Sequence, residues 1–191
     1  MDVLLPALVD RLLGHGPDPG EIPEVPADDV TGWLVPLATR LLGLLEQRTP
    51  KAPNAFLAHG FACLPLTSHD GGSLSLRLAY EPAWTPWPIT SSAVVLTVTG
   101  SLGLEVYQRP DDVQACRPQY ARTFGPEQVF AAHPGTLCAL RSSPGAMHVL
   151  AAAQPEAGPI GPVPFDGAAV LAHRARWVLQ RAVGAGCGGG R

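Results

Sequence analysis

Charged residues are scarce in this sequence, and lysine is almost missing. Of the 191 residues 15% are charged, the formal net charge is -3, and Lys51 is the one lysine beside twelve arginines. The arginines are spread along the chain without a run or cluster. Nucleic acids and anionic lipid surfaces are bound by clustered positive charge. We therefore expect no nucleic-acid partner and no membrane partner.

Long apolar runs are also missing, and we expect no secretory leader. No uncharged apolar stretch approaches the roughly 20 residues of a membrane helix. The stretch 1–13 contains two acids and lacks a basic leader and a small-residue cleavage site. The four cysteines are widely spaced, unlike the dense pattern of a disulfide scaffold: Cys63, Cys116, Cys138 and Cys187. We expect a cytoplasmic protein with free thiols.

Familiar catalytic signatures are not found either. The sequence has no glycine-rich phosphate loop, no nucleophile elbow, no zinc-protease helix and no Cys-x-x-Cys pair. It does have 46% hydrophobic residues, a proportion typical of a packed interior. With this length the composition predicts one folded domain.

Helices are predicted at both ends of this domain. Leucines at helical spacing in 1–14 and the stripe from Trp33 to Leu45 predict N-terminal helices, within 1–50, that pack on the core. The range 154–183 contains a proline-rich loop, 154–165, and then a C-terminal helix. That loop either folds over an opening of the core or is a plain connector. The glycine-rich tail 184–191 is predicted to be disordered.

The region 51–153 is predicted to be a compact β core. Alternation with a period of two begins near Phe56, and in 73–80 the leucines and Tyr80 lie on one face while Ser73, Ser75 and Arg77 lie on the other. That pattern predicts a strand with one solvent-facing side. Seven short strands with close turns predict an antiparallel sandwich or barrel: 56–66, 73–80, 93–99, 102–107, 128–132, 136–140 and 147–152.

The stretch 133–148 carries a family resemblance. It reads as a strand, a tight turn at Pro144-Gly145, and a returning strand that begins at His148. Gly135, Pro144, Gly145 and His148 resemble the second motif of the cupin superfamily, more loosely of its cysteine-dioxygenase-like branch, although the proline and glycine are adjacent here and the glycine-to-histidine interval is longer. The resemblance covers about 56–152. It implies a small antiparallel double-stranded β-helix barrel with His148 inside.

The first cupin motif, which supplies a histidine pair and an acid, is missing. If Gly100 is its last glycine, the acid position falls on Ala93 and the histidine positions fall on Trp87 and Ile89, or on Pro86 and Pro88. None of these side chains binds a metal. The resemblance therefore implies a divergent cupin without the metal site of the family.

A metal could be held by other side chains. The candidates are His148 together with His59, His133 or Cys138. On one extended strand His59 and Cys63 share a face, but about 13 Å separates them at the usual rise, which is too far to chelate one ion.

A rigid aromatic segment follows the predicted strand 73–80, at what should be the mouth of the barrel. Trp84 and Trp87 stand among prolines in 81–88, directly after Tyr80. Aromatics held in this way make a preorganised apolar wall for a ligand, so all three are candidate ligand-binding residues. The alternative is that the tryptophans plug the barrel as core.

Three functions follow from these observations. The first is a divergent cupin that binds or transforms a small, partly apolar organic molecule, by a non-redox cyclisation, isomerisation or dehydration without a metal cofactor, with His148 as acid or base. The second is a mononuclear, iron-dependent dioxygenase of the thiol type. The third is a non-catalytic interaction or dimerisation protein that uses its outer helices. Homodimers are frequent among cupin-like barrels, so a homodimer is compatible with each of the three functions and would not by itself decide among them.

Overall fold

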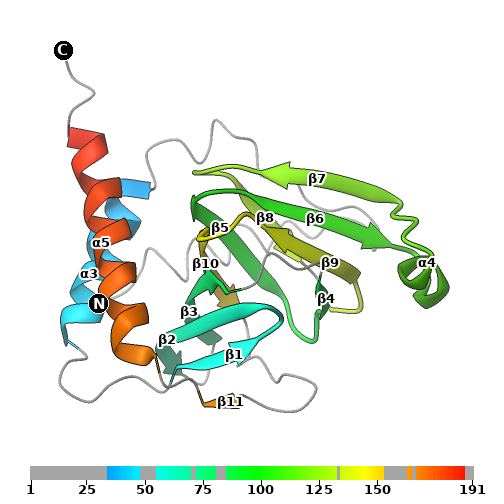
Figure 1. Ribbon diagram of the computed structural model, residues 1–191, viewed down its shortest axis with the longest axis horizontal. Helices are drawn as coiled ribbons and strands as arrows, with labels where there is room; N and C mark the ends of the chain where they lie inside the picture. The colour runs from blue at the N-terminus through cyan, green and yellow to red at the C-terminus, as the bar shows by residue number, and fades with distance from the viewer. Residues whose placement is uncertain are drawn as a thin grey trace.

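The computed structural model describes residues 34–47, 55–69, 72–80, 85–132, 134–152, 163–164 and 167–187. Strands dominate these ranges, and two long helices flank them (Figure 1). The elements are α3 (Leu34–Gln47), β1 (Phe56–Ala58), β2 (Phe61–His69), β3 (Gly72–Ala79), β4 (Thr85–Pro88), β5 (Ala93–Thr99), β6 (Leu102–Tyr107), α4 (Pro110–Gln114), β7 (Tyr120–Phe124), β8 (Val129–Ala132), β9 (Leu137–Ser142), β10 (Met147–Ala152), β11 (Val163–Pro164) and α5 (Ala168–Cys187).

Two antiparallel sheets form the core. The larger has the order β11-β1-β2-β3-β10-β5-β8, and the smaller has the order β4-β9-β6-β7. The antiparallel pairs β3·β10, β4·β9, β5·β8 and β6·β7 therefore lie alternately in the large and the small sheet. A chain that winds back and forth in such pairs makes the double-sheet jelly roll of cupins. The predicted cupin-like antiparallel barrel with flanking helices is confirmed.

A hairpin extends the large sheet at its edge. The sequence predicted one strand over 56–66, but β1 and β2 are separate strands joined at His59 and Gly60, whose φ angles are 50° and 77°. Two consecutive residues with positive φ make the tight turn that suits the twist of paired strands. The prediction that His59 and Cys63 share one strand face was wrong, because His59 lies in the turn.

The helices α3 and α5 pack against each other and cover the outer face of the large sheet (Figure 1). The stripe predicted for 33–45 is confirmed by the burial of Leu34, Leu41 and Leu45. The helix predicted in 1–14 lies outside the described residues. Helix α5 extends to Cys187, beyond the position where the tail was predicted to begin. No helix in the described residues is long and apolar enough to cross a membrane.

The large sheet separates two hydrophobic cores. On its outer face Leu74, Leu76 and Leu78 pack with the helices. On its inner face, between the two sheets, lies an aromatic-rich cluster that includes Phe61, Trp87 and Phe130. The sequence predicted that Ser75 and Arg77 face solvent, and this was wrong: both are buried, because helices cover one side of β3 and the second sheet covers the other.

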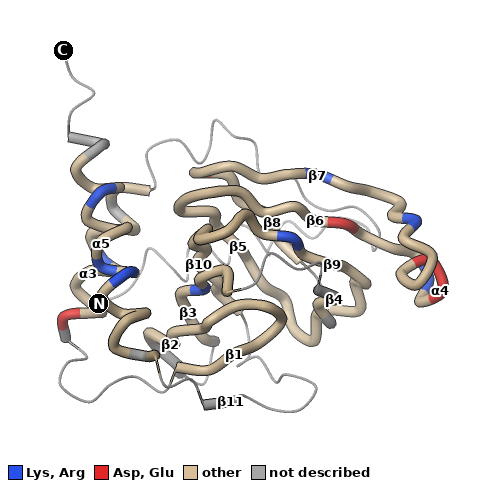
Figure 2. The backbone as a smooth tube through the Cα atoms, viewed as in Figure 1, with Lys and Arg blue, Asp and Glu red and all other residues tan. Residues whose placement is uncertain are grey.

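Charged side chains lie mainly outside this barrel. In Figure 2 the described acidic and basic residues gather on the two long helices and around α4, with few along the strands. Arg77 is the exception in the interior: it alone is charged among the buried polar residues of the described chain.

Candidate functional site

A row of polar side chains crosses four neighbouring strands on the barrel side of the large sheet. In the strand register Cys63 of β2 faces Arg77 of β3, Arg77 faces His148 of β10, and His148 faces Thr97 of β5. Their exposed fractions are 0%, 2%, 1% and 1%, in the order Cys63, Arg77, His148 and Thr97. Since register partners in antiparallel strands are nearest neighbours, the row is continuous.

The opposite sheet adds Ser142 of β9. Its hydroxyl lies 3.0 Å from Nε2 of His148, and both side chains are buried. The other ring nitrogen, Nδ1, has no hydrogen-bond partner among the described residues. If the Ser142 hydroxyl donates to Nε2, then Nδ1 carries the proton and can donate; with the other tautomer, Nδ1 can accept. Nε2 of the imidazole is therefore hydrogen-bonded to Ser142, and Nδ1 is available to a ligand.

Aromatic rings surround the row. The guanidinium carbon of Arg77 lies 5.6 Å from the ring centre of Phe61 and 5.5 Å from that of Trp87, which are cation–π distances. Phe61 also meets His148 edge to face at 5.8 Å. The rings of Trp87 and Phe130 are 6.3 Å apart. Arg77 and His148 thus share the aromatic ring of Phe61.

Burial sets the charge state of the row. Desolvation, with a further contribution from Arg77, lowers the pKa of His148 to about 3, so the imidazole is neutral at pH 7. Desolvation raises the pKa of the Cys63 thiol, against the opposing effect of Arg77, so the thiol keeps its proton. Burial lowers the pKa of Arg77, but a guanidinium starts so high that it stays charged. At neutral pH Arg77 is the charged member of the row.

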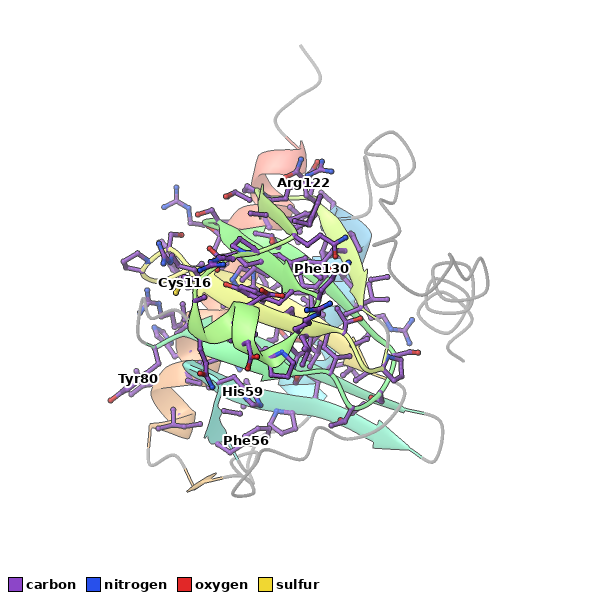
Figure 3. All side chains as sticks on the ribbon, turned by 90° about the vertical axis from the view of Figure 1, so that its right-hand side faces the viewer. Phe56, His59, Tyr80, Cys116, Arg122 and Phe130 are labelled. Atoms are coloured by element: carbon purple, nitrogen blue, oxygen red, sulfur yellow. The ribbon has the colours of Figure 1, made fainter. Side chains whose placement is uncertain are left out.

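The structure brings together some of the predicted site residues. His148 and Trp87 both lie in the barrel interior, connected through Arg77 and Phe61. Cys138 is buried nearby on β9, its thiol 3.4 Å from the carbonyl oxygen of Trp87, and burial raises its pKa to about 12. Tyr80 is 57% exposed and points away from the barrel (Figure 3).

Two further candidates, Trp84 and His133, lie outside the described residues. His59, another metal candidate, lies in the turn between β1 and β2 (Figure 3).

The positions of the missing cupin motif face the same interior. Trp87, Ile89 and Ala93 are 3%, 6% and 2% exposed and belong to the core cluster between the sheets. Apolar side chains therefore occupy the place that the resemblance gives to metal ligands. In the described part of the chain no three His, Cys, Asp or Glu residues come close enough to hold a metal ion.

Sequence reasoning missed three members of the site, Arg77, Thr97 and Ser142, and it considered Cys63 only as a metal ligand beside His59. Arg77 carried a signal, since it alternates with the leucines of β3. That alternation was assigned to a solvent face because the strand was not recognised as central. Thr97 and Ser142 had no signal of their own.

A separate hollow lies between the helices and the end of β5. Its volume is about 500 Å³, and its walls include Leu34, Val98, Trp177 and Arg181. Trp177 is 53% exposed and is stacked under Arg181, whose guanidinium carbon lies 4.9 Å from the ring centre. Of the predicted ligand-binding residues, Tyr80 and Trp87 are described, and neither lines this hollow.

Comparisons with known proteins concern the fold. No family model matches the chain, and no curated protein matches its sequence. Similar solved structures include KdgF of Halomonas sp. (14% identity, TM-score 0.40, 50% of this chain and 82% of that one) and a putative ethanolamine utilization protein Q of Salmonella typhimurium (9%, 0.42, 53% and 80%). Oxalate decarboxylase of Bacillus subtilis, a protein with Mn(II) centres, is another (10%, 0.44, 58% and 30%). Similarity this distant assigns neither an activity nor a metal.

Proposed function

We propose that this chain is a divergent cupin whose barrel binds a small, partly apolar organic molecule, with His148 as a polar contact and Trp87 as part of the apolar wall. The observation that carries the proposal is the Nδ1 atom of His148. It is buried and has no hydrogen-bond partner among the described residues. A ligand that supplies this partner explains why the barrel keeps a buried imidazole.

The free-energy balance supports this reasoning. A buried polar atom without a partner costs about 1–3 kcal/mol, and a neutral apolar side chain in its place would avoid that cost. The row of Cys63, Arg77, His148 and Thr97 lies inside a barrel. Apart from Ser75 and Ser142, the other buried side chains that are described there are mainly apolar. A few polar groups placed in an otherwise apolar interior are typical of a ligand-binding site.

Chemistry at this site would begin from a neutral imidazole. With a pKa of about 3, His148 at pH 7 donates or accepts a hydrogen bond and is a weak base. Desolvation is the main cause of this low pKa and Arg77 is the second, so a bound anion that opposes the effect of Arg77 raises the pKa. We therefore extend the proposal to a non-redox proton transfer by His148, such as an isomerisation or dehydration.

Binding is tested by a thermal-shift screen of small organic molecules, followed by titration calorimetry of those that stabilise the chain. We expect His148→Gln to weaken binding of the compounds found at least about tenfold, the effect of one lost hydrogen bond in a dry site. His173→Gln, the same substitution on the exposed side of α5, is the control and should bind normally. If no compound binds, or if the two variants bind equally well, the proposal is wrong.

The alternative hypothesis, an iron-dependent dioxygenase, is tested by measuring bound iron and oxygen consumption. It requires iron in near-stoichiometric amount in protein purified without chelator, and oxygen consumption with a thiol substrate. Elemental analysis of the wild type beside His148→Gln would then show metal that depends on His148. The third hypothesis, an interaction protein, predicts instead that the barrel binds no ligand and that the outer helices bind the partner.

A further inference from the structure

We propose that the hollow beside α5 is a docking surface for the N-terminal segment of the same chain. The leucine face of 1–14 covers the hollow, and the acidic stretch 18–29 runs along the arginines of α5. Residues 1–33 lie outside the described part of the chain. The inference concerns the outer helices, goes beyond the proposed barrel function and does not depend on it.

The hollow has an apolar floor and an aromatic rim. Leu34 and Val178 in its walls are 9% and 8% exposed, whereas Trp177 is 53% exposed. The other described lining residues are mainly small or aliphatic: Val35, Val98, Thr99, Glu127, Arg181 and Ala182. A half-exposed tryptophan beside aliphatic side chains is typical of a surface that docks another protein segment.

The N-terminal segment is attached at the hollow itself. Leu34, the first residue of α3, lines the hollow, and 33 residues precede it. An extended stretch of the length of 15–33 spans up to about 60 Å, so 1–14 can reach the hollow. The tether also raises the effective concentration of 1–14 at the hollow to the order of millimolar. A contact that is too weak to hold a free peptide can therefore hold this segment.

The apolar side chains of 1–14 match the hollow. Leu5, Leu8 and Leu12 stand at positions i, i+3 and i+7, which form one face of a helix. An amphipathic helix that lays such a face into a hydrophobic groove is a recurring mode of recognition. Trp177 and the aliphatic walls of the hollow provide the matching surface.

Charge favours this segment over a second copy of the helices. Residues 1–33 contain seven acids and one arginine, a formal charge of -6, although the whole chain carries -3. Helix α5 contains three arginines and no acid, and Arg174, Trp177 and Arg181 share one side of it at i, i+3 and i+7 (Figure 2). Glu127 is the one acid among the described lining residues, so the positive charge belongs to α5. The acidic segment is attracted to α5, whereas a second α5 would bring like charges together.

Photo-cross-linking of the full chain tests the docking. The photoactivated residue p-benzoylphenylalanine replaces Leu8, and mass spectrometry identifies the peptides that are joined after irradiation. We expect peptides from the walls of the hollow, with the cross-link at 177–182 of α5 or at 98–99 of β5. The same residue in place of Ala121, which is exposed on β7, is the control and should not reach these walls.

A mixture of isotope-labelled and unlabelled chains shows which chain supplies the occupant. Docking within one chain joins labelled to labelled and unlabelled to unlabelled peptides. Mixed pairs at the hollow would make a second copy the occupant and overturn the proposal. Cross-links that form only elsewhere overturn it as well.

Variants separate docking from the effect of the tether. Leu5→Ser combined with Leu12→Ser keeps the tether and the charge and removes the apolar face, so the yield of the cross-link should fall at least about tenfold. Arg181→Glu should lower the yield about two- to fivefold, as for loss of a surface ion pair. Arg141→Glu, at an exposed arginine of β9, should leave it unchanged. A yield that neither the serine pair nor Arg181→Glu lowers would reflect the tether alone and overturn the proposal.

Discussion

The two faces of the large sheet are both buried, yet they differ in composition. Between sheet and helices the core consists of leucine, valine, alanine and methionine alone, including Leu64, Leu76 and Val149. Between the two sheets the same strands present Cys63, Arg77 and His148. Neighbouring residues in one strand thus have different roles. Those that face the helices contribute by packing alone, whereas those that face the second sheet include buried polar groups, which cost stability.

The largest effect is expected in the outer core. Leu76→Ala, which removes a side chain that is 1% exposed, should lower the free energy of unfolding by about 2–5 kcal/mol, measured in urea. Binding of a ligand found in the thermal-shift screen should not change, because Leu76 faces the helices. Val170→Ser on the exposed side of α5 is the control and should stay within about 0.5 kcal/mol of the wild type. A loss of ligand affinity in folded Leu76→Ala would show that the two cores are not independent.

The pH dependence of stability distinguishes the inner core. The pKa of His148 is about 3 when folded and near 6.5 when unfolded, so the unfolded chain takes up the proton first as pH falls. The neutral imidazole of His148 therefore contributes fully to the free energy of unfolding above pH 6.5. This contribution is lost as the pH falls toward 3, at up to about 1.4 kcal/mol per pH unit. The free energy of unfolding of His148→Gln should fall less steeply with decreasing pH than that of the wild type. His173→Gln should follow the wild type. Parallel curves for His148→Gln and the wild type would show that His148 is not held neutral.

A smaller effect is expected at the hydrogen bond between the sheets. Ser142→Ala removes the partner of His148 Nε2 and should cost about 1–2 kcal/mol of unfolding free energy. It should also weaken binding of a ligand found in the thermal-shift screen, because the tautomer of the His148 imidazole is no longer fixed. Thr39→Ala, which removes an exposed bond to the Val35 carbonyl, is the control and should cost less. If the alanine variants at 142 and 39 behave alike, Ser142 does not orient His148.

The strands could be predicted wherever alternation was regular. The expected ranges 93–99, 102–107 and 147–152 match β5, β6 and β10. The strands β4 and β7 were missed: β4 is rich in proline, and β7 follows the short helix α4, which was not predicted either. Both are edge strands of the small sheet, where pairing with one neighbour forms the strand despite weak local preference.

The candidate site could be predicted only in part. His148 was found through a motif resemblance, and Trp87 through its proline-rich surroundings. Arg77 was assigned to solvent, since a charged side chain alternating with leucines normally faces water. Cys63, Thr97 and Ser142 have ordinary local sequences, and they become neighbours of His148 only through strands distant in the chain.

The sequence by itself determined the class of fold, the helical stripe of α3 and the turn at Pro144-Gly145, because these follow from local periodicity and turn chemistry. The tertiary structure decided which face of β3 meets the helices, and therefore that Arg77 lies inside the barrel. Period-two alternation separates the two faces of a strand but does not say what covers each of them. That depends on strand pairings and helix packing between residues far apart in the chain.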